Sequence, residues 1–103
     1  MKQVRPKKNL GQHFLTDLNI AKRIADTVDA CPDIPVLEIG PGMGVLTQFL
    51  VEKPREVKAV EIDDESVRYL NEKFPKLRDN IIGDDFLRMD LSQVFDGKPF
   101  VLT

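Results

Sequence analysis

The spacing of apolar residues along the chain predicts strands and helices in alternation. Four short apolar runs have the length and composition of strands that are covered on both faces. These runs lie at residues 36–39, 57–62, 80–83 and 99–103. Apolar residues recur at helical spacing before and between the runs. The helical segments lie at about residues 17–29, 44–52 and 63–74, with a turn or short helix at 86–94. Strands that alternate with helices predict a parallel sheet with right-handed crossovers.

Polar residues and a proline mark the ends of the predicted helices. Thr16 or Asp17 is the expected N-cap of the first helix, and Asp63 or Asp64 is that of the third. Pro75 ends the third helix, because proline does not continue a helix without a break. The expected order is helix, strand, helix, strand, helix, strand, short helix and strand, which is an α/β arrangement.

A glycine-rich turn follows the first predicted strand and carries the first functional signal. Three of the chain's six glycines, Gly40, Gly42 and Gly44, lie within residues 37–45. Glycine adopts positive φ readily and lets a ligand approach the main chain closely. In parallel α/β sheets, ligands bind beyond the carboxyl ends of strands, where unpaired helix N–H groups point outward. The sequence therefore predicts a ligand site at this turn.

Acidic residues after the next two predicted strands narrow the class of ligand. Glu61 follows Gly40 at about the spacing at which a carboxylate accepts hydrogen bonds from ribose hydroxyls. After the third strand, Asp84 or Asp85 is placed to bond an adenine amine, with Phe86 covering the ring. An Asp-rich turn with a core phenylalanine explains that segment equally well. The pattern predicts an adenosine-type cofactor, either S-adenosylmethionine or NAD.

Other residues that carry chemistry are few. Glu38 lies within the first predicted strand, where it either caps backbone or cofactor groups near the glycine turn or faces a sheet edge. His13 is the only histidine and has no cysteine beside it, so we expect no metal site. No nucleophile–histidine set suited to covalent catalysis can be assembled. The single cysteine, Cys31, excludes an intrachain disulfide framework and favours a reducing cytoplasm.

Composition and charge restrict the class of protein further. The 103 residues are 42% hydrophobic and 31% charged, which is typical of one globular domain or part of one. No apolar run has the roughly 20 residues that a membrane span needs, and the basic N-terminus lacks a secretory signal. The net charge is −2. We divide the chain into a basic arm at 1–15, which is suited either to contact phosphates or to remain solvated, and a partial domain at 16–103.

Four motifs carry a resemblance to a known family. They are Lys8–Leu15 (KNLGQHFL), Leu37–Thr47 (LEIGPGMGVLT), Val60–Asp63 (VEID) and Gly83–Leu87 (GDDFL). Their order and spacing resemble the ribosomal RNA adenine N6,N6-dimethyltransferases, which modify adenines near the 3′ end of small-subunit RNA. The first motif is the most specific, because general methyltransferases lack it. The resemblance implies a Rossmann-like methyltransferase fold, S-adenosylmethionine as cofactor, and small-subunit ribosomal RNA or the pre-30S particle as partner.

The resemblance also implies which residues contact the cofactor. They are His13, Leu15, Gly40, Gly42, Glu61, Ile62, Asp85 and Phe86. The two arm residues fold over the methionine end, and the two glycines face the methionine and the ribose. Glu61 holds the ribose hydroxyls and Asp85 bonds the adenine amine, each with its following residue beside the adenine. The family pattern thus favours Asp85 over Asp84.

The family's catalytic signature, Asn-(Leu/Ile/Phe)-Pro-Tyr, would begin at about the residue where this sequence ends. Methyltransferases that act on a base hold it extruded against the methyl donor, and the resemblance assigns that task to the signature. We therefore expect an N-terminal fragment without catalytic residues, without later strands and without the helical C-terminal domain. We expect it to be inactive on RNA alone, to bind cofactor weakly, and to expose a sheet edge through which copies self-associate.

Three alternative functions remain open at the level of the sequence. The related macrolide-resistance enzymes, which methylate an adenine of 23S ribosomal RNA, share the arm and the glycine turn, although Pro41 favours the small-subunit family. A non-catalytic RNA-binding assembly module would rely on the basic arm. An NAD-dependent oxidoreductase would use the same spacing of glycines and acid.

Overall fold

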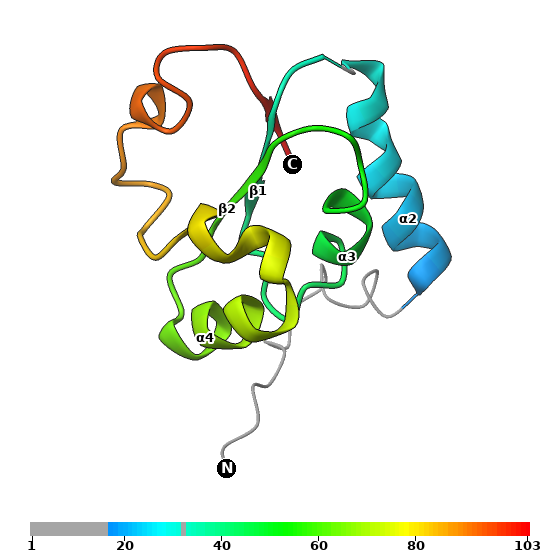
Figure 1. Cartoon of the computed structure of the whole chain (residues 1–103), viewed down its shortest axis with the longest axis horizontal. Coiled ribbons are helices and arrows are strands. Elements are labelled where there is room, and N and C mark those ends of the chain that lie inside the picture. The colour runs from blue at the N-terminus through cyan, green and yellow to red at the C-terminus, as the bar shows by residue number, and fades with distance from the viewer. Residues whose placement is uncertain (1–16, 32) are drawn as a thin grey trace.

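The computed structural model describes residues 17–31 and 33–103 (Figure 1). The elements are α2 (Leu18–Asp26), η1 (Thr27–Ala30), β1 (Val36–Ile39), α3 (Thr47–Leu50), β2 (Val57–Val60), α4 (Asp64–Lys73), η2 (Pro75–Asn80), β3 (Ile81–Ile82), η3 (Leu91–Gln93) and β4 (Val101–Leu102). The alternation of strands and helical segments confirms the predicted α/β order. The predicted arm at 1–15 lies outside the described residues.

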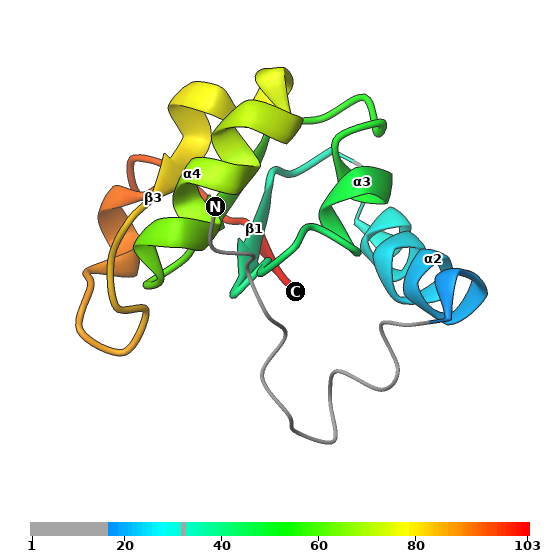
Figure 2. The same cartoon turned by 90° about the horizontal axis from the view of Figure 1, so that it is seen from below.

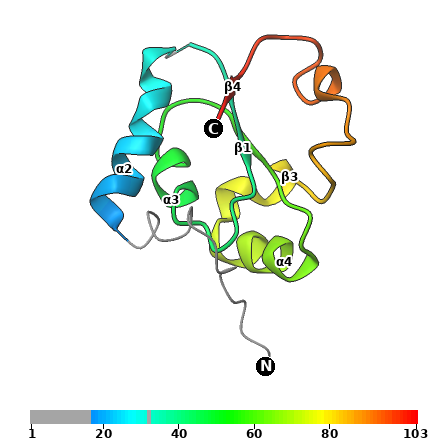
Figure 3. The same ribbon diagram turned by 180° about the vertical axis from the view of Figure 1, so that it is seen from behind.

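The four strands form one parallel sheet in the order β3-β2-β1-β4. From β1 the chain proceeds outward through β2 to β3, and β4 then returns to pair with the other side of β1 (Figure 3). The direction of winding therefore reverses between β1 and β4. Open α/β sheets bind their ligands in the crevice at the carboxyl ends of strands where this reversal occurs. The topology places the glycine turn, which directly follows β1, at that crevice.

Two apolar clusters cover the two faces of the sheet. The cluster on the face of α2, α3 and α4 contains Ala25, Val28, Val36, Leu50, Val57, Ala59, Leu70, Phe74 and Leu77. The cluster on the opposite face contains Leu37, Val60, Val94 and Phe95. In Figure 2, α4, α3 and α2 follow one another from left to right, and the orange η3 segment lies at the far left. Right-handed connections explain the two faces, because the chain winds in opposite directions on the two sides of β1.

The predicted element ends agree with the structure at most positions. β1 coincides with the predicted strand, and β2 ends two residues before the predicted end. The side chain of Asp17 accepts the Asn19 N–H at 2.9 Å, so Asp17 is the N-cap of α2. Asp63 is the N-cap of α4 and accepts the Ser66 N–H at 3.0 Å. These bonds satisfy N–H groups that have no partner within the helix.

The second predicted helix is the main correction. The sequence predicts a helix over residues 44–52, whereas α3 covers only Thr47–Leu50. Gly44 has a φ of +83°, which is incompatible with a right-handed helix, so the chain is still turning at this residue. The first predicted helix is also divided, because its last turn, η1, tightens into a 3₁₀ helix.

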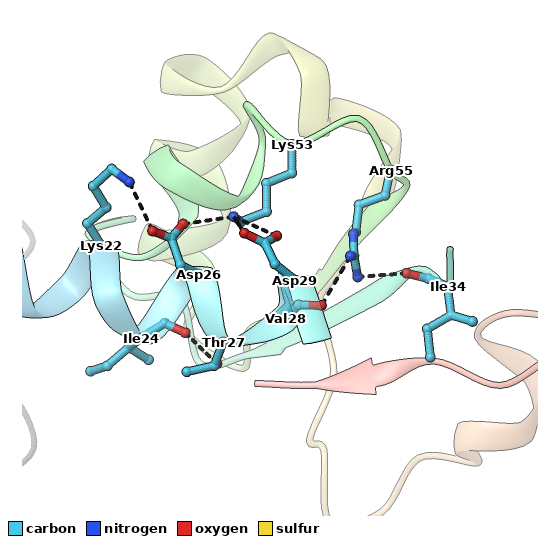
Figure 4. Close-up of polar contacts among 9 residues, drawn as sticks. All are labelled: Lys22, Ile24, Asp26, Thr27, Val28, Asp29, Ile34, Lys53 and Arg55. Atoms are coloured by element: carbon cyan, nitrogen blue, oxygen red, sulfur yellow. Dashed lines mark hydrogen bonds and ion pairs between the residues drawn. The ribbon is translucent and has the colours of Figure 1, made fainter. Parts of the chain in front are cut away.

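A cluster of ion pairs ties α2 to the segment after α3 (Figure 4). The Lys53 ammonium lies 2.8 Å from Asp26 and 3.0 Å from Asp29, and Lys22 pairs with the other oxygen of Asp26 at 2.9 Å. The hydrogen bond from Lys53 is the main reason that the pKa of Asp26 is lowered, and the same bond raises the pKa of Lys53. Arg55 donates to the backbone oxygens of Val28 and Ile34. Through Lys53 and Arg55, the segment between α3 and β2 is therefore attached to α2, to η1 and to the chain just before β1.

Candidate functional site

The turn after β1 holds its shape through positive φ angles and short backbone bonds. Gly40, Gly42 and Gly44 have φ angles of +62°, +57° and +83°. The Gly40 N–H donates to the Val60 oxygen at 2.8 Å, and the Gly44 N–H donates to the Pro41 oxygen at 2.8 Å. The first bond extends the pairing of β1 with β2 into the turn. Left-handed angles of this kind are strained for residues with a Cβ, which explains why glycine occupies all three positions.

The third glycine also has a packing role. A Cβ on Gly44 would lie 2.4 Å from Cε2 and 2.8 Å from Cζ of Phe74, and 3.3 Å from Cδ2 of Leu70. Among residues 17–31 and 33–103, nothing lies within 4 Å of a Cβ built on Gly40, and the nearest atom to one built on Gly42 is the Gly40 oxygen at 3.9 Å. Gly44 therefore lets α4 and its C-terminal phenylalanine pack directly on the turn. The first two glycines leave open space around the main chain instead.

Glu61 lies at the end of β2 and is bonded to the glycine turn. The Gly42 N–H donates to Oε1 of Glu61 at 2.9 Å, and the Asp63 N–H donates to Oε2 at 3.1 Å. The residue is only 7% exposed. A carboxylate offers about four lone-pair positions, and these two bonds use one on each oxygen. Glu61 is thus oriented by the backbone and keeps acceptor capacity for a pair of donors.

Glu38 is a second buried carboxyl group beside the turn. It is 2% exposed and accepts the Thr47 hydroxyl at 2.6 Å, so it does not face a sheet edge. Its partner is a side-chain hydroxyl next to the turn, and not one of the backbone or cofactor groups that the first alternative predicted. The pKa of Glu38 is raised to about 7, mainly because the carboxyl group is buried; the bond from Thr47 opposes the increase, and the negative charge of Glu61 adds to it. Near neutral pH, Glu38 therefore exists in both protonation states.

Three further predicted site residues, Ile62, Asp85 and Phe86, follow the ends of β2 and β3 at the same edge of the sheet. Ile62 follows Glu61 and is 63% exposed, which leaves an apolar surface beside the carboxylate. Asp85 follows β3, and its carboxylate accepts the Leu87 N–H at 3.0 Å and lies 3.7 Å from Arg88 Nε. Phe86 packs partly against the cluster on the η3 face of the sheet, as the core alternative predicted. His13 and Leu15 lie outside the described residues.

Thr47 was not singled out as a site residue by the sequence. Its functional signal is weak, because a threonine after a run of turn residues is usual at the start of a helix. What identifies it is its bond to Glu38, which spans the whole glycine turn. The pair connects the end of β1 to the first residue of α3. Thr47 is completely buried, so its hydroxyl needs this acceptor.

The described part of the chain, residues 17–31 and 33–103, shows no metal site and no membrane-spanning helix. Among these residues, no group of three or more histidine, cysteine or acidic side chains is arranged to hold a metal ion. No helix within them is long and apolar enough to cross a membrane. A cavity of about 470 Å³ lies at the amino ends of the strands, and Arg55 and Lys58 are among its lining residues. Both of these cations donate to backbone oxygens, so they serve to hold the fold.

A parallel sheet with a glycine turn at its reversal point and an acid after the next strand defines a Rossmann-like domain for a nucleoside-containing ligand. The chain belongs to the family described as ribosomal RNA adenine dimethylase, whose sequence model matches residues 3–100. This match confirms the family that the four motifs predict.

Individual relatives agree with this assignment. The chain is 71% identical over 100 residues to the ribosomal RNA small subunit methyltransferase A of Phocaeicola vulgatus, covering 97% of this chain and 36% of the relative. It superposes on the crystal structure of the 23S rRNA methyltransferase ErmE with a TM-score of 0.68 and 38% identity, covering 86% of this chain and 35% of that one. The plantazolicin methyltransferase BpumL in complex with SAH shares the fold, with a TM-score of 0.53 and 15% identity, over 80% and 32% of the two chains. The structure is therefore a Rossmann-like methyltransferase fold that spans about a third of its relatives' length.

Proposed function

We propose that this chain supplies the S-adenosylmethionine-binding part of an enzyme that dimethylates N6 of adenines near the 3′ end of 16S ribosomal RNA. The observation that carries the proposal is the bond between the Gly42 N–H and the Glu61 carboxylate at the reversal point of the sheet. This bond supports the proposal because it joins main-chain groups and a carboxylate at the edge where open α/β sheets bind nucleosides. Family membership supplies the reaction class.

The arrangement of side chains supports a specific set of contacts. The free lone pairs of Glu61 would accept the two ribose hydroxyls, and the exposed Ile62 would lie against the adenine. Asp85 would accept the adenine amine, next to Phe86, one strand further along the same edge. The open space at Gly40 and Gly42 would admit the methionine and ribose portions.

The remaining contacts are proposed from the family pattern. His13 and Leu15 of the arm would cover the methionine end. The cofactor's sulfonium methyl is the group transferred. We assign no catalytic residue to the described part of the chain, and we divide the sequence functionally into the arm at 1–15 and the cofactor-binding segment at 16–103.

Small-subunit ribosomal RNA is the proposed substrate, in the form of the pre-30S particle in the cytoplasm. The support is the name of the relative that is 71% identical, which is a small subunit methyltransferase. The 23S alternative is represented by a solved structure of lower identity, at 38%. The fold superposes on the 23S enzyme as well, so sequence similarity, and not the fold, favours the small subunit.

Self-association through β4 is proposed as a property of this chain. β4 pairs with β1 and is the last strand in the sheet order, and Leu102 is 50% exposed. An edge strand with apolar exposure is a template for pairing with a second chain. Light scattering should show dimers that a Leu102→Lys variant loses. A monomer at all concentrations would contradict this proposal.

Calorimetry with S-adenosylmethionine tests the cofactor assignment. We expect measurable binding by the chain, a loss of at least about tenfold in affinity for Glu61→Ala, and no change for Glu72→Ala. The first substitution removes a hydrogen-bonded acceptor, whose loss typically costs 1.5–3 kcal/mol when it is charged. Glu72 is an exposed residue of α4 and provides a matched control. Undiminished binding by Glu61→Ala, or preferential binding of NAD, would overturn the proposal.

A further inference from the structure

The strand register places two carboxyl groups on the same face of the sheet. Glu38 is paired with Ala59 across β1 and β2, and Glu61 lies two residues beyond Ala59. Side chains two residues apart on a strand point to the same face, and the bond from the Glu61 N–H to the Ile82 oxygen shows that the ladder continues to this residue. Glu38 and Glu61 therefore sit side by side beneath the turn, and both are buried.

The surroundings of Glu38 leave its charge without a cationic partner among the described residues. From α3 it receives the Thr47 hydroxyl, and from the end of β2 the Glu61 carboxylate acts on it. Lys58, the nearest basic residue on β2, belongs to the opposite face and donates to the Val94 oxygen. A buried anion beside another anion is unfavourable, and this explains the raised pKa of Glu38. A positive charge placed at this edge of the sheet would stabilise the ionised form of Glu38 and lower its pKa.

The methyl donor and its product differ in this respect. S-adenosylmethionine carries a methylated sulfonium, whereas S-adenosylhomocysteine has lost this methyl group and has an uncharged thioether; the amino-acid, ribose and adenine groups are the same in both. Attraction between a sulfonium and a carboxylate is strong where water is excluded. The charge state of a carboxyl group under the turn therefore discriminates between the two ligands, while Glu61, as a ribose acceptor, treats them alike.

We propose that Glu38 is a specificity-determining residue whose proton is released to solvent when the cationic donor binds and retained when the uncharged product binds. This inference rests on the proposed function, since it requires the donor to occupy the turn. Glu38 acts on the sulfur through the electrostatic field beneath the turn, and the Thr47 hydroxyl stabilises its ionised form. The turn thereby favours donor over product after each transfer, without any additional contact to either ligand.

The coupling between proton release and binding gives the expected direction and size of the pH dependence of donor affinity. If the donor lowers the pKa of Glu38 by about one unit, donor affinity rises roughly fivefold between pH 6 and pH 8, whereas product affinity stays nearly constant. The ratio of the two affinities changes across the interval in which free Glu38 titrates. Glu38→Gln cannot ionise and removes this change, although it keeps an acceptor for Thr47.

Calorimetry in buffers of different ionisation enthalpy tests this proposal directly. We expect net proton release on binding of S-adenosylmethionine at pH 7, little release with S-adenosylhomocysteine, and no release with either ligand for Glu38→Gln. Thr47→Val should move the midpoint of the donor's pH dependence upward, because the ionised form loses its hydrogen bond. Glu72→Gln, the same substitution on the exposed face of α4, should behave as the original chain.

The outcomes separate this inference from the function on which it rests. Binding of both ligands with an affinity ratio that does not change from pH 6 to pH 8 would overturn the role of Glu38 and leave the cofactor assignment intact. Absence of binding by both ligands would overturn the two together. As a readout that does not depend on Glu38→Gln folding, carbon-13 NMR of the Glu38 carboxyl in the original chain should show its titration midpoint fall on donor addition and stay in place with the product.

Discussion

Single residues in the glycine turn have different physical tasks, although the motif repeats one residue type. Gly40 and Gly42 have positive φ angles and open space among the described residues, as the proposed cofactor contacts require. Gly44 has a positive φ, and the Phe74 ring occupies the space in which a Cβ would lie. The motif therefore combines two positions proposed to face the cofactor with one packing position. Substitution at Gly44 should lower stability, whereas substitution at Gly40 or Gly42 should mainly weaken cofactor binding.

Gly44→Ala should destabilise the fold strongly. The added methyl meets the Phe74 ring at 2.4 Å, and the left-handed φ is strained for alanine. Together these effects should lower the free energy of unfolding by about 3 kcal/mol, as measured by urea denaturation. Gly83→Ala, where the nearest atom is 3.9 Å away, is the control and should change it by less than about 0.5 kcal/mol. Equal stability of the two variants would contradict the packing role.

Glu38 should make the stability of the chain depend on pH. Its pKa is about 7 in the folded chain against 4.5 for the free side chain, so between these values the folded state holds a proton that the unfolded state has released. The Glu38 contribution to the free energy of unfolding is therefore fully present below about pH 4.5. It falls by roughly 3 kcal/mol as the pH rises to about 7. Glu38→Gln should remove this decline, which denaturation at a series of pH values would measure; a parallel decline in the variant would exclude Glu38 as its source.

Sequence spacing predicted the position of Glu61 beside the glycine turn. Glu61 follows an apolar strand at a fixed distance from the turn, and the structure brings it to Gly42, while its role toward a ribose stays a prediction. The Glu38–Thr47 bond was not predicted, because it depends on how far the turn folds back. The packing role of Gly44 depends on Phe74, thirty positions away, which no local pattern reveals.

At the scale of elements, short helical segments are held in place by contacts at their ends. α3 has only four residues, which is too short to be stable by itself, so its position depends on its neighbours. Thr47 attaches its start to β1, and Lys53 attaches the segment after it to α2. The length of α3 could not be read from apolar spacing, because Gly44, Val45 and Leu46 continue the helical pattern while the backbone is still turning.

Lys53→Met should loosen the attachment of α2. The Lys53 side chain is 12% exposed and pairs with Asp26 and Asp29, so its removal takes one partner from each, and Asp26 keeps its pair with Lys22. We expect the melting temperature to fall by a few degrees and the effect to shrink at high salt. Lys76→Met is the matched control, because Lys76 is 67% exposed and lies 3.8 Å from Glu52. A melting temperature unchanged in Lys53→Met would show that the cluster contributes nothing.

At the scale of the whole molecule, the fold is a small parallel sheet in which the two central strands, β1 and β2, are hydrogen-bonded on both sides. β1 is bonded on both sides, to β2 and β4, and β2 is bonded to β1 and β3. The alternation of elements predicted this parallel sheet. The strand order was not predicted, because nothing in the sequence states on which side of β1 the last strand returns. That side is decided by the apolar residues Val94 and Phe95, which cover the opposite face.

Amide hydrogen exchange should follow the order of the strands. The N–H groups of β1 and β2 lie in the middle of the sheet under two apolar clusters, so they should exchange slowest. Those of β3 and β4, which are two residues long and lie at either end of the strand order, should exchange much faster. Exchange followed by NMR would test this. Protection of β4 equal to that of β1 at low protein concentration would contradict it.

The register of β1 and β2 has a consequence for how the sequence can change over time. Glu61 meets Gly42 only because Val36 and Val57 are aligned, and a shift of one residue would turn Lys58 toward the helices and Glu61 away from the turn. Insertions and deletions between residues 36 and 61 should therefore survive only where the chain can absorb them before β2 begins, in the turns at 51–56. Functional variants of this chain that differ in length should therefore differ at residues 51–56, and the number of residues from Val57 to Glu61 should stay the same.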